Sequence, residues 1–381
     1  MKIIFNRQLL INTVSPLMCA VAPKGTNPVT EYIQISATAE KGIVLTTYDL
    51  EKGVRTAAEG EIEREGCYCV NANKLFQTLK VMESEEVSLE VSENLETTIR
   101  SGRSLYRMQA LNGEDFPILP TVRSGSGFEV SSAKLKTMIS KISYAMGIND
   151  QRPVLNGAFF KISNGQLMTV ACDSFKLAKC VCRTEIRNLS EGDADYQYII
   201  PQKTVNELFR MLPDGEDDTV VFNLSHKNMV CSFNGLTFYS RLIEGEYIDF
   251  DRIIIKNHKI SVIADRGQLL AALDRAAVVT EEKVPGSTRT PLKFTVEGNV
   301  LKLNAVSSVG VSYEELEVEH TGDDIVISFN NRNLIDSVKS CSGEKIRIEL
   351  STPLYSINII PLNPGEGNED VFFMMPIRTK N

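Results

Sequence analysis

The chain repeats one order of segments three times, with a period of about 125 to 130 residues. Each copy opens with a short apolar strand that leads into a segment of helical periodicity, at 2–17, 127–142 and 259–276. A second strand-to-helix segment follows in each copy, at 68–82, 198–212 and 325–341. A long fixed period is typical of a structural unit that has been multiplied. The sequence therefore predicts three domains of one topology.

Alternating apolar residues predict strands for the rest of each unit. A strand that ends in a polar turn lies between the two helices, at 42–53, 166–177 and 300–311. A strand pair closes each unit, at 87–108, 220–242 and 346–362. Two helices among about eight antiparallel strands make each unit an α+β domain. We place the three domains at 1–125, 126–255 and 256–381.

Length and composition agree with several ordinary cores. The chain has 381 residues, and 43% of them are hydrophobic. A chain of this length usually folds around more than one core. Its apolar stretches are shorter than the roughly 18 to 20 residues of a membrane span, and its start lacks a signal-peptide pattern. We therefore expect a cytoplasmic protein.

Eight cysteines are scattered through the chain and include two C-x-C pairs, Cys67 with Cys69 and Cys180 with Cys182. Each pair lies in a predicted strand, where both thiols would point to one face. None of the three histidines is near either pair in the sequence, so a complete set of metal ligands is lacking. We read these cysteines as small apolar side chains and expect neither a metal nor a cofactor.

Charge is divided between the predicted helices and the remainder of the chain. Six helical segments carry twelve basic and four acidic residues, a net charge of +8. Because the whole chain has a net charge of −8, everything outside these segments amounts to −16. A basic surface on repeated helices is typical of proteins that bind the phosphate backbone of duplex DNA without reading its bases. For any single helix, the alternative is an ordinary solvated face.

Motifs of catalysis are missing from the sequence. It contains no phosphate-binding glycine loop, no dinucleotide fingerprint, no zinc-protease motif and no nucleophile elbow. Its acidic clusters fall in predicted turns, where a solvated surface is the simplest interpretation. We expect no catalytic residues and no enzymatic activity.

Several short motifs in one register resemble a known family. They are RSGRS at 100–104, DFP at 115–117, RPVLNG at 152–157, ACDSFKLA at 171–178, IIPQKTVNELFRML at 199–212 and MMPIR at 374–378. Together with the threefold unit, they resemble the bacterial DNA polymerase III β subunit, the sliding clamp. The resemblance implies a head-to-tail homodimer that forms a ring of six domains, with helices lining a hole that holds duplex DNA. It also implies partners that bind through short peptide motifs: the replicative polymerase, the clamp loader and repair polymerases.

The family's partner-peptide cleft lies between its second and third domains. Carried over by position, the second domain and the linker would supply Leu155, Cys172, Ser174, Phe175, Lys176, Leu177, Ile248, Arg252 and Ile253. The third domain would supply Asn330, Leu354, Ser356, Phe373, Met374, Met375, Pro376, Ile377 and Arg378. An apolar groove rich in methionine suits a site that holds many different peptides.

The same resemblance implies residues for DNA and for the ring interface. The contacts with the DNA backbone would be Lys24, Lys74, Asn149, Lys203 and Arg210. The dimer interface would join Arg100, Arg103 and Tyr106, with Lys74 nearby, to Val278, Val279, Glu314 and Glu315 of the other subunit.

The chain departs from the family pattern at Ser174, Phe175, Ile248 and Asn333, and it continues past Arg378 through residues 379–381. These departures leave the peptide preference of the cleft open. Two other classes of function also remain: a nucleic-acid-processing enzyme with an unusual acidic site, and a repeat protein that binds peptides but not DNA.

Overall fold

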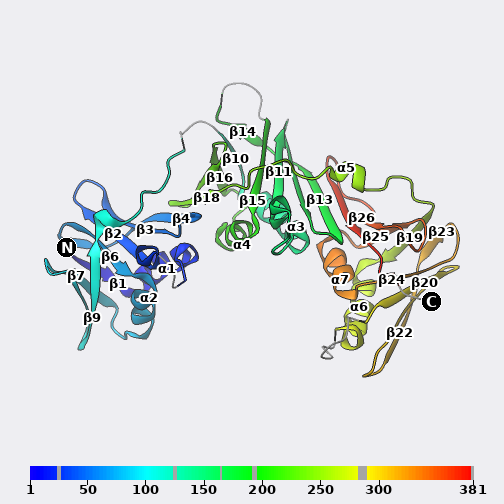
Figure 1. Ribbon diagram of the computed structural model, residues 1–381, viewed down its shortest axis with the longest axis horizontal. Helices are drawn as coiled ribbons and strands as arrows, with labels where there is room; N and C mark the ends of the chain where they lie inside the picture. Colours follow the sequence, from blue (N-terminus) through cyan, green and yellow to red (C-terminus); the bar gives the residue numbers. More distant parts are fainter. Residues whose placement is uncertain (24–26, 123–126, 164, 191–194, 282–289, 379–381) are drawn as a thin grey trace. The chain divides into compact units, whose positions relative to one another are not determined.

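The computed structural model describes residues 1–23, 27–122, 127–163, 165–190, 195–281 and 290–378. Its elements follow one order three times: a strand, a helix, five strands, a second helix and three strands (Figure 1). This confirms the threefold α+β unit. Each unit has nine strands rather than about eight, and the closing strand pair is a set of three. The sequence reading missed the shortest strands and the tight turns between the closing ones.

The first repeat contains β1 (Lys2–Asn6), α1 (Arg7–Leu17), β2 (Tyr32–Thr38), β3 (Gly42–Tyr48), β4 (Lys52–Ala58), β5 (Glu61–Arg64), β6 (Gly66–Asn71), α2 (Ala72–Val81), β7 (Glu86–Val91), β8 (Glu96–Ser101) and β9 (Ser104–Asn112). The turn between β8 and β9 has only two residues, and its Gly102 has a φ of 57°. A side chain rarely adopts this left-handed conformation, so glycine is favoured there.

The second repeat contains β10 (Gly127–Ser131), α3 (Ser132–Ile142), β11 (Gly157–Ser163), β12 (Gln166–Cys172), β13 (Lys176–Arg183), β14 (Ile186–Asn188), β15 (Asp195–Pro201), α4 (Gln202–Met211), β16 (Thr219–Leu224), β17 (Asn228–Phe233) and β18 (Leu236–Arg241). Asn234 and Gly235 join β17 to β18 with positive φ at both positions, as a tight hairpin requires.

The third repeat contains β19 (Ile260–Asp265), α6 (Arg266–Thr280), β20 (Leu292–Glu297), β21 (Val300–Val306), β22 (Val311–Glu317), β23 (Glu319–Thr321), β24 (Ile325–Phe329), α7 (Asn331–Ser340), β25 (Lys345–Leu350), β26 (Ile357–Pro361) and β27 (Glu369–Met374). A one-turn helix, α5 (Phe250–Ile253), precedes it. Asp265 caps α6 and Asn330 caps α7, each accepting backbone N–H groups of the first helical turn.

The strands join into sheets that run across repeats. One sheet has 14 strands, and in it β18 of the second repeat pairs antiparallel with β4 of the first. A second sheet has nine strands in the order β15-β11-β12-β13-β27-β26-β25-β19-β23, in which β13 of the second repeat pairs with β27 of the third. Neither sheet stops at a predicted domain boundary, and those boundaries stay a prediction.

The chain divides into two compact units. The first consists of Met1–Ala133, Arg187–Gly192 and Arg210–Leu242, and it contains the fourteen-stranded sheet. The second consists of Lys134–Ile186, Asp193–Phe209 and Ile243–Asn381, and it contains the nine-stranded sheet and a four-stranded sheet in the order β22-β21-β20-β24. Within the second unit, α6 packs against α7 (Figure 1). Among the helices that the structure describes, none has the length and apolar character needed to cross a membrane.

Candidate functional site

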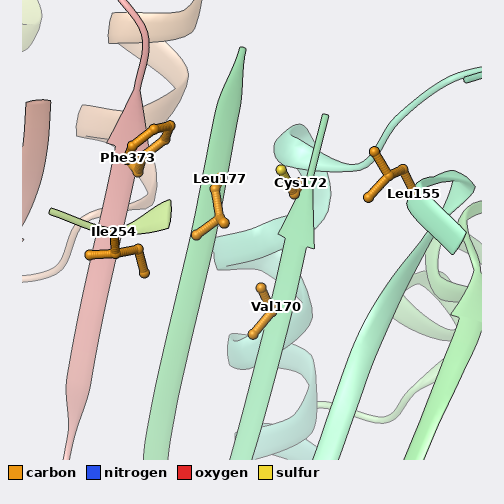
Figure 2. Packing of buried hydrophobic residues seen from close by; sticks show 6 residues of the cluster. All are labelled: Leu155, Val170, Cys172, Leu177, Ile254 and Phe373. Carbon is orange, nitrogen blue, oxygen red and sulfur yellow. The ribbon is translucent and has the colours of Figure 1, made fainter. Parts of the chain in front are cut away.

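An apolar cluster in the second unit gathers much of the predicted cleft. Its buried members come from β12, β13 and β27, from the turn before β11 and from the residue after α5: Leu155, Val170, Cys172, Leu177, Ile254 and Phe373 (Figure 2). Leu177 lies opposite Cys172 on one neighbouring strand and opposite Phe373 on the other. Cross-strand partners share a face of the sheet, so these three side chains meet. We call this set the cleft cluster.

The linker before the third repeat covers part of the cleft cluster. Ile248 and Phe250 are partly buried against it, and Tyr247 stacks on Phe159 with 5.5 Å between ring centroids. Ile253 remains 39% exposed, so it presents apolar surface beside the buried residues. The linker therefore forms one wall of the site.

The turn between β12 and β13 places an aromatic ring at the edge of the cleft cluster. The Asp173 carboxylate accepts the backbone N–H groups of Phe175 and Lys176, which fixes the turn. The Phe175 side chain is 65% exposed. The backbone of Met375 donates to the Phe175 carbonyl at 2.8 Å, which ties the C-terminal segment to this turn.

Arg152 was missed among the predicted cleft residues, although it opens the RPVLNG motif. Its Nη2 donates to the Ser174 hydroxyl at 3.0 Å, and its Nε donates to Asp150 at 3.1 Å. The hydrogen bond from Arg152 lowers the pKa of the Asp150 carboxyl below its ordinary value. A positive group is thus held beside the turn that carries Phe175.

Two predicted cleft residues lie elsewhere. Met374 is fully buried and pairs with Ile357, on the face opposite Phe373, because side chains alternate along β27. Lys176 alternates with Leu177 in the same way, and its ammonium binds Asp173 at 2.6 Å. Neither side chain lines the cleft cluster. The sequence motif MMPIR did not reveal which methionine faces outward.

The remaining predicted cleft residues differ in exposure. Leu354 is 61% exposed and Met375 38% exposed, whereas Ser356 is buried. Arg252 and Arg378 are exposed, and Pro376 and Ile377 are half-buried. The Asn330 side chain accepts N–H groups from Arg332 and Asn333 and so acts as a helix cap. Tyr355, 57% exposed beside Leu354, is an aromatic residue that the sequence reading missed.

Burial favours the protonated form of the Cys172 thiol. Burial raises its pKa to about 12, and the Asp173 carboxylate adds to this rise. Only the thiolate is reactive, so the protonated group serves as an apolar part of the cleft floor. In the part of the chain that the structure describes, no group of three or more His, Cys, Asp or Glu is arranged to hold a metal.

The predicted DNA contacts are exposed where they can be described. Lys74 on α2, Lys203 on α4 and Arg210 near the end of α4 are exposed, as is Asn149, whose φ is 54°. Lys24 lies outside the described residues. The Lys74 ammonium makes no ion pair within the described part of the chain.

Each of two sheets exposes an apolar strand edge. Within the described residues, 104–109 of β9 pair only with β8, and Leu105 and Tyr106 are 42% and 40% exposed. β22 pairs only with β21 in the described residues, and its Val311 and Tyr313 are 66% and 53% exposed. An open apolar edge favours pairing with another chain.

The predicted interface residues are distributed around these two edges. Arg100 and Arg103 flank the exposed end of β9. Val278 on α6 is 77% exposed, while Val279 is half-buried. Glu314 is already held by Arg275, with Nη2 to Oε2 at 2.6 Å, and Glu315 accepts a hydrogen bond from the Tyr313 hydroxyl. Glu314 is therefore ion-paired within the chain, whereas Glu315 is exposed and makes no ion pair in the described residues.

Comparison with known proteins decides the family. Models of the DNA polymerase III beta subunit match the chain in sequence order: the N-terminal domain at residues 1–120, the central domain at 129–249 and the C-terminal domain at 251–376. The chain belongs to the DNA polymerase III beta subunit family. This confirms the resemblance and the three-domain clamp fold, and members of this family are processivity factors rather than enzymes.

Relatives of this family match the chain over its whole length. The beta sliding clamp of Staphylococcus aureus is 27% identical over 390 residues, with 100% of both chains covered. The DNA polymerase sliding clamp of Bacillus subtilis has the same fold, with a TM-score of 0.91 at 24% identity and 100% coverage of both chains. The Pseudomonas aeruginosa sliding clamp, solved with a ligand, gives a TM-score of 0.87 at 26% identity, again with full coverage of both chains.

Proposed function

We propose that this DNA sliding clamp acts as a head-to-tail homodimeric ring that encircles duplex DNA and tethers replication and repair proteins to it. The family match along all three domains carries the proposal. The ring, its interface and its cleft residues are those that the family resemblance implies, and the exposed side chains of this chain support them.

Two complementary strand edges support a head-to-tail ring. The end of β9 is apolar at Leu105 and Tyr106 and is flanked by Arg100 and Arg103. β22 is apolar at Val311 and Tyr313, and its exposed carboxylates are Glu315 and Glu317. Two unlike surfaces on one chain produce a heterologous contact, which forms a ring if the rotation closes. Opposite charges at the rim would set the register.

Basic side chains on the helices support non-specific contact with DNA. Lys74, Lys80 and Lys203 are exposed and make no ion pair within the described residues. Ammonium groups attract phosphates without selecting bases. Because a closed ring would hold DNA by topology, these contacts can be weak enough for sliding.

Retention on circular DNA tests this function. Protein loaded onto a nicked circular plasmid should co-elute with it in gel filtration and should be released when a restriction enzyme linearises the circle. Release on linearisation is the mark of encirclement. Equal retention on circular and linear DNA would contradict the ring, and a monomer at micromolar concentration would contradict the dimer.

We also propose that the cleft cluster binds short apolar peptide segments of partner proteins. Buried Leu177 and Phe373 form its floor, while exposed Phe175, Leu354 and Met375 extend apolar surface around it. Exposed aromatic and methionine side chains adapt to many apolar sequences. Arg152 beside Ser174 adds a fixed positive group that suits a peptide carboxylate or carbonyl oxygen.

A substitution at the exposed Phe175 should weaken peptide binding without affecting folding. Phe175→Ala should weaken binding of a partner polymerase roughly tenfold, because interface aromatic groups often contribute more than 1 kcal/mol. Its stability should change by less than about 0.5 kcal/mol, since the ring is mostly in solvent. Ile118→Ala, which removes an 89% exposed apolar side chain outside the cleft and outside both strand edges, is the control. Undiminished affinity in Phe175→Ala would remove this residue from the site.

A further inference from the structure

A second cavity lies on the same face of the nine-stranded sheet as the cleft cluster. It has a volume of about 440 Å³ and is bounded by the linker after α5, by β25 to β27 and by the loop that precedes β27. Ile254 and Val371 line this cavity and also pack in or against the cleft cluster. The linker therefore separates two adjoining sites, and a polypeptide in the cleft is within reach of the second one. We call it the linker pocket.

Most of the charge around the linker pocket is already neutralised. Lys179 binds Asp251 at 2.9 Å and Glu369 at 3.6 Å. Asp370, on the opposite face of β27, binds Lys141 at 2.6 Å. Glu349 is half-buried and makes no ion pair in the described part of the chain; the exposed Lys256 does not bind it. One carboxylate of the pocket is therefore left without a cation.

A buried amide beside Glu349 has an acceptor without a donor. Asn358 is 4% exposed, and its Nδ2 lies 2.9 Å from the Ile255 carbonyl, 3.0 Å from His258 Nε2 and 3.4 Å from Glu349 Oε2. Because the amide nitrogen has two hydrogens, the two shorter contacts fix the orientation of the amide, and the contact with Glu349 is secondary. The Oδ1 atom of Asn358 is left buried with no hydrogen-bond partner. An unpaired buried acceptor is costly, and the neighbouring Glu349 carboxylate has no cation in the described residues, so the two groups together suit a ligand that brings N–H groups.

We propose that the linker pocket binds the guanidinium group of an arginine side chain from a partner polypeptide whose adjoining segment lies in the cleft. A guanidinium has five N–H donors in one plane and serves a carboxylate and an amide oxygen together. Apolar side chains of Ile255, Ile360 and Pro361 would surround the methylene stem. The assignment to a partner polypeptide rests on the proposed clamp function, whereas the chemistry of the pocket does not.

Isoleucine methyl groups allow the pocket and the cleft to be observed separately. Ile255 and Ile360 line the linker pocket, while Ile248 and Ile253 belong to the linker wall of the cleft. In methyl NMR spectra of the whole protein, agmatine should shift Ile255 and Ile360 and leave Ile248 and Ile253 in place. Butylurea, which has a similar stem without charge, should not shift them. An absence of agmatine shifts at Ile255 and Ile360 would overturn the pocket.

A matched pair of variants tests the acceptor groups. Glu349→Gln should weaken agmatine binding about tenfold or more, because a hydrogen-bonded charge is lost. Glu344→Gln removes an exposed carboxylate at the turn before β25 and should leave agmatine binding unchanged. Unperturbed Ile248 and Ile253 signals would establish that Glu349→Gln is folded. Equal agmatine affinity in wild type and Glu349→Gln would contradict the assignment.

The polypeptide source is tested with overlapping short peptides from the organism's own replicative polymerase. A cleft-binding peptide with an arginine should lose about tenfold in affinity when citrulline replaces that arginine. The loss should disappear in Glu349→Gln, since the two changes remove one contact. If agmatine binds but no arginine peptide shows this coupling, the partner assignment is wrong. Retention of Glu349→Gln on circular DNA is scored separately, so a failure of the clamp function itself would be recognised there.

Discussion

The first and third repeats have the same order of elements but opposite charge where their strands are exposed. Around β9 the exposed charged groups include Arg100 and Arg103, whereas β22 exposes Glu315 and Glu317. Apolar periodicity fixes the strands and helices and is common to both repeats. Surface charge is free of that constraint. The two exposed edges of one chain therefore carry opposite charge, and the proposed head-to-tail assembly depends on this difference.

The helices of the two repeats differ in the same way. On α2, Lys74 and Lys80 make no ion pair in the described residues, and the Lys80 ammonium lies 4.1 Å from the Phe76 ring centroid. On α7, Arg332 lies 3.4 Å from Asp336, and Lys339 lies 3.7 Å from Asp274 on α6. Each helix carries two basic residues, so a count of basic residues does not distinguish α2 from α7. In the described residues, the two basic groups of α2 are therefore free of ion pairs, whereas the two basic groups of α7 are paired.

Reversing the basic edge should have the largest effect. Arg100→Glu with Arg103→Glu should raise the dissociation constant of the dimer by roughly a hundredfold or more, because like charges across an interface cost several kcal/mol. Sedimentation velocity over a concentration series measures this change. Adding Glu315→Arg and Glu317→Arg should restore the dimer. Lys41→Glu, on the exposed turn between β2 and β3, is the control, and a dimer that withstands the double reversal would exclude this edge from the interface.

A buried amide distinguishes the helix pairs of the two repeats. The first residue of α7 is Asn331, whose Nδ2 donates to the Leu273 carbonyl and to Thr280 Oγ1 of α6, both at 3.0 Å. The first residue of α2 is Ala72, also buried. Asn331→Ala should cost about 1 to 2 kcal/mol, since the Leu273 carbonyl and the Thr280 hydroxyl lose a donor. Urea unfolding of wild type and Asn331→Ala measures this loss in the free energy of unfolding.

The half-buried Asn333 on the same helix provides the control, and Asn333→Ala should change stability by less than about 0.5 kcal/mol. A loss in Asn331→Ala no larger than that of Asn333→Ala would show that the amide does not join the two helices.

Neutralising the basic side chains of the first repeat should weaken DNA binding more than neutralising those of the third repeat. Lys74→Gln with Lys80→Gln should reduce the slope of log affinity against log salt by up to about two, because each lost phosphate contact removes about 0.9. Arg332→Gln with Lys339→Gln should reduce it less, since these groups bind carboxylates. Retention on circular DNA at increasing salt gives both slopes. Equal losses would mean that the ion pairs of α6 and α7 open when DNA binds.

The smallest effect is expected at an exposed ion pair. The hydrogen bond from Arg275 lowers the pKa of the Glu314 carboxyl, and this pair therefore stabilises the folded chain above the ordinary carboxyl pKa. The contribution is lost as the pH falls through the lowered pKa. The stability difference between wild type and Arg275→Gln should thus be present at neutral pH and vanish in acid. A difference independent of pH would mean that the arginine acts through packing alone.

The matched change in the first repeat is Arg107→Gln, which removes a longer pair of 3.5 Å to Glu96. Both of its side chains are more than half exposed, so screening by water should make its effect smaller still.

Part of the cleft could be predicted from the sequence. Leu155, Cys172, Leu177, Ile248 and Phe373 were expected together, and they do lie in or against one cluster. Met374 and Lys176 were included because they match the family's cleft by position, but they pair with each other across the strands on the face opposite Leu177 and Phe373. Arg152 and Tyr355 were omitted, because their positions depend on loops rather than on a periodic element.

By itself, the sequence determined the threefold α+β unit, because apolar spacing differs between helix and strand and recurs with one long period. It also determined that positive charge gathers on the repeated helices. The tertiary structure alone decided which of those charges remain unpaired, which residues share the cleft cluster and where the linker pocket lies. Ion pairs such as Arg275 with Glu314, and the pairing of β13 with β27, join residues far apart in the chain. Such contacts depend on three-dimensional proximity, which no local pattern specifies.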